Sequence, residues 1–129
     1  MPDPYAASRQ AGERIEALYA RPLTELAADA APGSMRYALL DSFDALQYAE
    51  RAVAFHTEQL HRLTGPERAM GSVEVGHIAD AARRLAHAVA VRDSHAQVLG
   101  GVLQSLHRTP GTTTPVPGPM PSAAPARSR

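Results

Sequence analysis

Residues 39–63 read LLDSFDALQYAERAVAFHTEQLHRL, and residues 78–106 read IADAARRLAHAVAVRDSHAQVLGGVLQSL. Large residues recur every seventh position in both segments. The first ladder is Leu39, Leu46, Val53 and Leu60, and the second is Ile78, Leu85, Arg92, Leu99 and Leu106. Apolar residues at this period mark the seam of a helix that packs lengthwise against another helix. Gly65 and Pro66 lie between the ladders and stop a helix. The two segments therefore predict a long antiparallel helical hairpin.

The limits of the hairpin helices follow from caps and from register. Ser34 is a residue type that caps helix N-termini, so the first hairpin helix is expected to begin there. The second begins either at Pro66 or at Ser72. A register that faces large ladder residues with alanines, such as Leu46 against Ala88, favours the later start. The expected helices are 34–63 and 72–108.

The remaining chain divides into three parts. Residues 1–5 contain two prolines and predict a flexible lead-in. Residues 6–30 favour an N-terminal helix that Pro22 kinks or restarts, because proline removes a backbone donor and clashes with the preceding turn. Residues 109–129 contain six prolines and few large apolar residues, which predicts a disordered tail. We expect one all-α domain over residues 6–108, as a three-helix bundle or a dimeric bundle.

Composition excludes several classes of function. Thirteen basic residues balance thirteen acidic ones, so no overall charge draws the chain to nucleic acid. The absence of cysteine excludes disulfides, thiolate catalysis and zinc–cysteine sites. All basic residues are arginine and lysine is absent, which is typical of a GC-rich bacterial genome. The N-terminus lacks the pattern of a signal peptide, and no apolar run approaches the roughly 18 residues of a membrane span. These features predict a cytoplasmic protein without membrane contact.

Motifs for catalysis are missing as well. The sequence has no Gly-x-Ser-x-Gly elbow and no glycine-rich phosphate loop after a strand. We therefore expect a non-enzymatic protein with no cofactor.

Two Glu-x-x-His pairs provide an alternative hypothesis. Glu58 with His61, and Glu74 with His77, each place two metal ligands on one helical face near the same end of the hairpin. Ferritin-like di-iron bundles build their sites from pairs with this spacing. However, Glu58 and His61 flank core residue Leu60 on the outer side, so a solvated face is the preferred interpretation and a metal-binding bundle assembled across a dimer is the runner-up.

Three polar residues occupy seam positions. Arg92 replaces an apolar ladder residue, and a polar group at such a position commonly fixes register or partner number. We expect its guanidinium to reach Asp41 or Asp44 or to point out of the bundle, because an unpaired buried charge is costly. His56 and His95 also lie in the seam, where they are expected to pack in the core or to make assembly sensitive to pH.

Surplus apolar residues beside the seam favour an interaction protein. They are Val91, Val98 and Leu103 on the second hairpin helix, with Leu40 and Phe43 on the first. A hairpin that buries only its seam leaves such flanks uncovered, so a second copy or another helical protein is expected to cover them. A third hypothesis, a small nucleic-acid-associated regulator, uses Arg62 and Arg68 near the hairpin turn; interleaved acidic residues make this partner unlikely.

Overall fold

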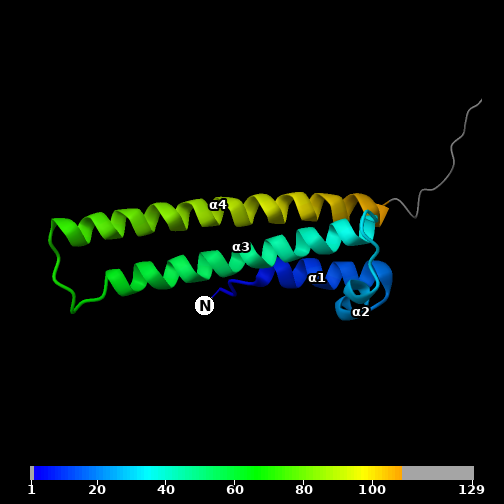
Figure 1. Cartoon of the computed structure of the whole chain (residues 1–129), viewed down its shortest axis with the longest axis horizontal. Coiled ribbons are helices and arrows are strands. Elements are labelled where there is room, and N and C mark those ends of the chain that lie inside the picture. Colours follow the sequence, from blue (N-terminus) through cyan, green and yellow to red (C-terminus); the bar gives the residue numbers. More distant parts are fainter. Residues whose placement is uncertain (1, 109–129) are drawn as a thin grey trace, which may run out of the picture.

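The computed structural model describes residues 2–108 and, within them, an all-α fold of four helices (Figure 1). The helices are α1 (Ala6–Tyr19), α2 (Leu23–Ala28), α3 (Met35–Leu63) and α4 (Ser72–Arg108). Helices α3 and α4 run antiparallel along their length, and α1 lies along the half of the hairpin that is remote from the α3–α4 loop (Figure 1). This confirms the predicted all-α hairpin with an N-terminal helix packed on it. The predicted disordered tail, residues 109–129, lies outside the described residues.

Local capping explains where the hairpin helices begin and end. The Ser34 hydroxyl accepts the Tyr37 N–H at 3.1 Å, which caps α3 as predicted. At the other end, the Thr64 N–H donates to the Leu60 carbonyl at 3.1 Å. Helix α4 begins at Ser72, where the Glu74 carboxylate accepts the Gly71 N–H at 3.0 Å. The later of the two predicted starts is therefore confirmed.

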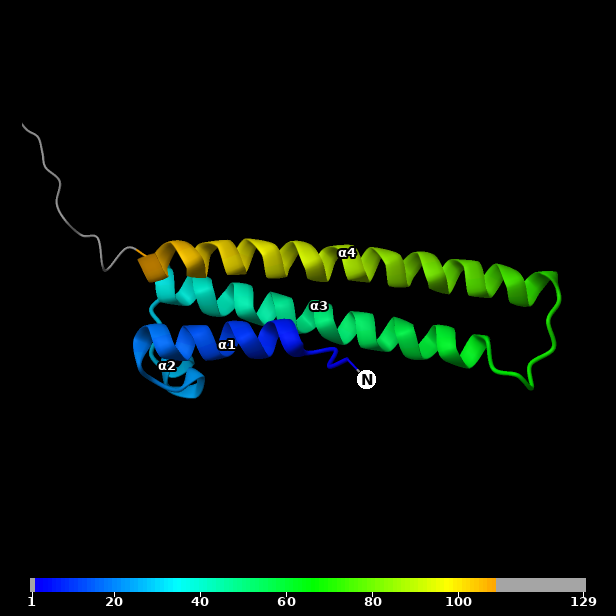
Figure 2. The ribbon, with the colours of Figure 1, turned by 180° about the vertical axis from the view of Figure 1, so that it is seen from behind.

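The N-terminal helix is interrupted at the predicted place. Ala20 ends α1 in the left-handed region, with φ of 56°, and its N–H donates to the Glu16 carbonyl. Pro22 then becomes the N-cap of α2 and not its first helical residue. The Glu16 carboxylate accepts the Leu23 N–H at 2.9 Å and links the two helices. Of the two predicted alternatives, a kink or a restart, the structure shows a restart, and α2 lies beside the end of α1 (Figure 2).

The main core lies where α1 and α2 pack against α3 and α4. Its buried residues are Ala11, Ile15, Leu26, Leu39, Leu40, Phe43, Leu46, Leu99 and Leu103. Full burial of one such large side chain contributes about 1.5–3 kcal/mol. Gly12 lets α1 approach closely, because a Cβ there would lie 3.1 Å from Leu23 Cδ1 and 3.3 Å from Phe43 Cε1.

The two ladders differ in burial along the hairpin. Val53 is still buried, whereas Leu60, Ile78 and Leu85 are only half-buried. The cause is the length of α1: its 14 residues span about 21 Å, so it covers only part of α3. Small residues fill the seam beside the ladders, since Ala49, Ala81 and Ala88 are all buried. That arrangement allows the two helix backbones to approach closely.

Arg92 does not reach across the hairpin. Its guanidinium pairs with the neighbouring Asp93 at 2.9 Å, and its side chain is 28% exposed. Asp41 and Asp44 are therefore not its partners, because a carboxylate on its own helix is nearer and the seam position is open to solvent. Arg92 is a residue at the edge of the seam, not a buried charge.

Candidate interaction groove between helices α3 and α4

An open groove of about 690 Å³ runs between α3 and α4 near the middle of the hairpin. Residues of α3 on its walls are Ala45, Tyr48, Ala49, Ala52 and His56. Those of α4 are Arg83, Arg84, His87, Ala88, Val91 and His95. No residue of α1 or α2 lines this α3–α4 groove. It is therefore a surface of the hairpin that the chain's other described helices do not cover.

Small residues make the floor of the α3–α4 groove. Ala45, Ala49 and Ala52 follow one another at helical spacing, so they share one face of α3. Ala88 and Val91 do the same on α4. Alanines at such positions leave space for a further helix to approach the backbone. The floor has the shape and chemistry of a helix-packing surface.

His56 and His95, predicted as seam residues, line this groove and are half-buried. The ring of His56 meets the ring of Phe55 edge-on, with centroids 5.3 Å apart. His56 also lines an adjoining pocket of about 440 Å³ together with Asp80 and Arg84. The histidines thus lie at the wall of an open surface, where solvent or a partner reaches them.

Charged and aromatic residues flank the groove. Arg83 pairs with Asp80 on the same helix, whereas Arg84 has no ion-pair partner within residues 2–106. Tyr48 is 71% exposed, and the Arg51 guanidinium lies 5.9 Å from the centre of its ring. An aromatic ring this exposed, beside an apolar floor, is typical of a site for protein contact.

The structure changes the expected set of partner residues. Helix α1 and its core cover Leu40, Phe43 and Leu103, which are 9%, 9% and 2% exposed. The sequence prediction that these three face a partner is corrected, because the chain's own N-terminal helix packs there. Val91 remains accessible in the groove, and Val98 is 62% exposed one turn beyond His95.

The residues of the metal hypothesis take other roles or face solvent. Glu58, His61 and His77 are exposed near the loop end of the hairpin. Glu74 holds the Gly71 N–H, and the backbone N–H groups of Glu74 and Gly71 lower the pKa of this carboxyl below its ordinary value of 4.5. Among the described residues, no three His, Asp or Glu side chains come together as a metal site would require.

The capping role of one buried carboxylate was not anticipated from the sequence. Glu50 on α3 is fully buried, and its Oε2 accepts the Ser8 N–H at 2.9 Å. Ser8 belongs to the first turn of α1, whose N-cap residue Tyr5 makes no side-chain cap. Glu50 therefore caps α1 from another helix and complements its dipole. The sequence does contain a signal, because a helix that starts at Tyr5-Ala6 lacks a capping side chain of its own.

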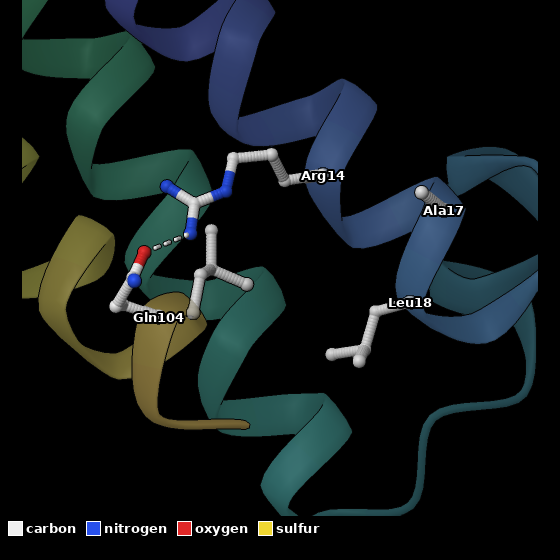
Figure 3. A pocket seen from close by; sticks show the side chains of 5 residues that line it. Arg14, Ala17, Leu18 and Gln104 are labelled. Atoms are coloured by element: carbon white, nitrogen blue, oxygen red, sulfur yellow. Dashed lines mark hydrogen bonds between the residues drawn. The ribbon is translucent and has the colours of Figure 1, made fainter. Parts of the chain in front are cut away.

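A smaller pocket of about 380 Å³ lies between α1 and α4. Arg14 closes one side of it by donating to Gln104 Oε1 at 3.4 Å (Figure 3). Its other walls are Ala17, Leu18 and Leu103. These side chains include no carboxylate, imidazole or hydroxyl, so the pocket offers no group for acid–base or nucleophilic catalysis.

Comparison with known proteins yields no matching family model, and no curated protein or solved structure is significantly similar to the chain. Within the part of the chain that the structure describes, no helix combines the length and apolar character needed to cross a membrane.

Proposed function

We propose that this chain is a non-enzymatic interaction protein whose α3–α4 groove binds a helix of another polypeptide. The observation that supports the proposal is the uncovered groove itself, with an alanine floor and the exposed ring of Tyr48 beside it. Burial of apolar surface is the main driving force of protein association. A helix laid in the groove removes from water the apolar surface that Ala45, Ala52 and Val91 still expose.

The dimensions of the groove fit a short helical contact. From Ala45 to His56, α3 rises about 17 Å, or about three helical turns. A partner helix of about 12 residues spans that length. Half-buried Leu85 and the other incompletely covered ladder residues of this half of the hairpin also favour a further layer.

The test uses one substitution in the groove and one outside it. Ala52→Arg places a long charged side chain on the floor, while Ala86→Arg makes the same change at an exposed position of α4 that does not line the groove. Circular dichroism is expected to show that both variants keep the helical content of the unsubstituted chain. In affinity capture from cells of the source organism, a protein retained by the unsubstituted chain and by Ala86→Arg, but lost with Ala52→Arg, supports the proposal. Identical captured proteins for all three chains overturn it.

A further inference from the structure

Three positions of α3 match three positions of α4, because each helix has an aspartate, an alanine and a histidine at the same spacing. On α3, Asp41 precedes His56 by fifteen residues, and on α4, Asp80 precedes His95 by fifteen. Each helix also has a buried alanine eight residues after its aspartate, Ala49 on α3 and Ala88 on α4. In both helices the aspartate lies two turns before the alanine and the histidine two turns after it, so all three share one face.

Because the helices are antiparallel, each end of the groove combines an aspartate from one helix with a histidine from the other. At the loop end, His56 and Asp80 line the same pocket, beside Arg84. At the opposite end, His95 lines the groove, and the exposed residue Asp41 lies one helical turn before the lining residue Ala45. These three pairs of matching positions are therefore related by an approximate twofold axis perpendicular to the hairpin. The other lining residues do not follow it, since Arg83 and Arg84 of α4 correspond to Asp44 and Ala45 of α3.

We propose that the occupant of the α3–α4 groove is a second copy of this chain, packed face to face so that two hairpins form a four-helix bundle. The inference rests on the proposed function and names the partner. A twofold axis across the helices puts α3 on α3, so that Asp41 of one copy approaches His56 of the other. A twofold axis along the helices puts α3 on α4, so that Asp41 approaches His95. In either arrangement every aspartate of the pattern meets a histidine of the second copy.

This complementarity distinguishes a second copy from the chain's own C-terminal segment. Residues 109–129 include two arginines and no acidic residue, so they offer no carboxylate side chain to the histidines or to Arg84. Asp80 can still contact a second copy although it pairs with Arg83, because both side chains are at least half exposed and an ion pair at the surface is weak.

The experiment exchanges the charges of the two partners. One full-length chain carries Asp41→Arg with Asp80→Arg, and a second carries His56→Glu with His95→Glu. In a dimer of either double variant alone, arginine meets histidine or aspartate meets glutamate at all four contacts. The dissociation constant of each of these homodimers is therefore expected to rise by about tenfold or more. Mixed together, they face arginine with glutamate and aspartate with histidine, and a heterodimer is expected. Circular dichroism confirms that each variant keeps its helices.

Sedimentation equilibrium separates the outcomes. The proposal expects a concentration-dependent mass up to twice 13.7 kDa for the unsubstituted chain, weakened in each double variant, restored in their mixture and lost with Ala52→Arg. A mass of 13.7 kDa at every concentration would show that the groove does not bind a second copy and would overturn this inference. The proposed function would then be tested by the capture experiment alone. A dimer that Ala52→Arg leaves intact, or a mixture no tighter than its components, also overturns this inference.

Discussion

Replacing Leu99 with alanine is expected to lower the free energy of unfolding by about 3 kcal/mol. Leu99 is a ladder residue of α4, is 1% exposed and belongs to the core to which all four helices contribute. The substitution removes three carbons, worth about 0.8 kcal/mol each by transfer, and leaves a cavity that adds to the loss. For a domain of this size, that change lowers the melting temperature by roughly 10–20 °C.

The matched control is Val73→Ala on the same helix. Val73 is 63% exposed, so its truncation is expected to change stability by no more than about 0.5 kcal/mol. Urea unfolding followed by circular dichroism gives both values, provided that the slope m is unchanged. If Leu99→Ala costs less than about 1 kcal/mol, the core as described is refuted.

Three further predictions concern the caps and the metal hypothesis. Glu50→Ala is expected to lower the free energy of unfolding by about 1–3 kcal/mol, because it leaves the buried Ser8 N–H without an acceptor, whereas Glu50→Gln keeps an acceptor oxygen and costs less. Hydrogen exchange in the first turn of α1 should become faster in the alanine variant. Unchanged exchange would contradict the capping role of Glu50. Because the pKa of Glu74 is lowered in the folded protein, its carboxylate stabilises the protein above pH 4.5, and this contribution is lost as the pH falls through the pKa of the folded state. Glu74→Gln should therefore make the melting temperature depend less on pH at acid pH. An identical pH dependence of the melting temperature in both proteins would contradict this prediction. Elemental analysis after growth with iron, zinc and manganese is expected to detect no stoichiometric metal, and a chelator is expected to leave the melting temperature unchanged; one bound metal per chain would restore the Glu58 and His61 hypothesis.

Features that depend on local sequence were predicted well. The ladder from Leu39 to Leu60 and the one from Ile78 to Leu106 each encode one helix, because helical periodicity needs only near neighbours. The cap of α3 at Ser34 also depends only on near neighbours in the sequence, since its hydrogen bond to Tyr37 spans three residues. The break before Pro22 was also predictable, because the constraint is built into that residue.

Features that depend on how far α1 reaches were not predictable. Helix α1 covers Phe43 and Leu103, which sequence analysis had assigned to a partner. The position of α1 on the hairpin cannot be predicted from the periodicity of the sequence. The bond from Ser8 to Glu50 spans forty-two residues and is equally invisible to pattern analysis. Arg92 was expected either to reach Asp41 or Asp44 or to point out of the bundle, and the structure pairs it with its sequence neighbour Asp93. For the groove, the sequence supplied Val91, His56 and His95, and only the packing of α3 against α4 brought them to one surface.

The most direct test of the groove as a contact between two copies is site-specific photo-crosslinking of the full chain. A benzophenone amino acid replaces Tyr48, which is 71% exposed beside the groove, and in a control it replaces Tyr37, which is 46% exposed near the start of α3. The predicted result is a chain-to-chain adduct from Tyr48 but not from Tyr37, with the bond mapped by mass spectrometry to residues 41–56 or 80–98 of the second copy. The absence of any adduct from Tyr48, or equal yields from both positions, would contradict the central claim.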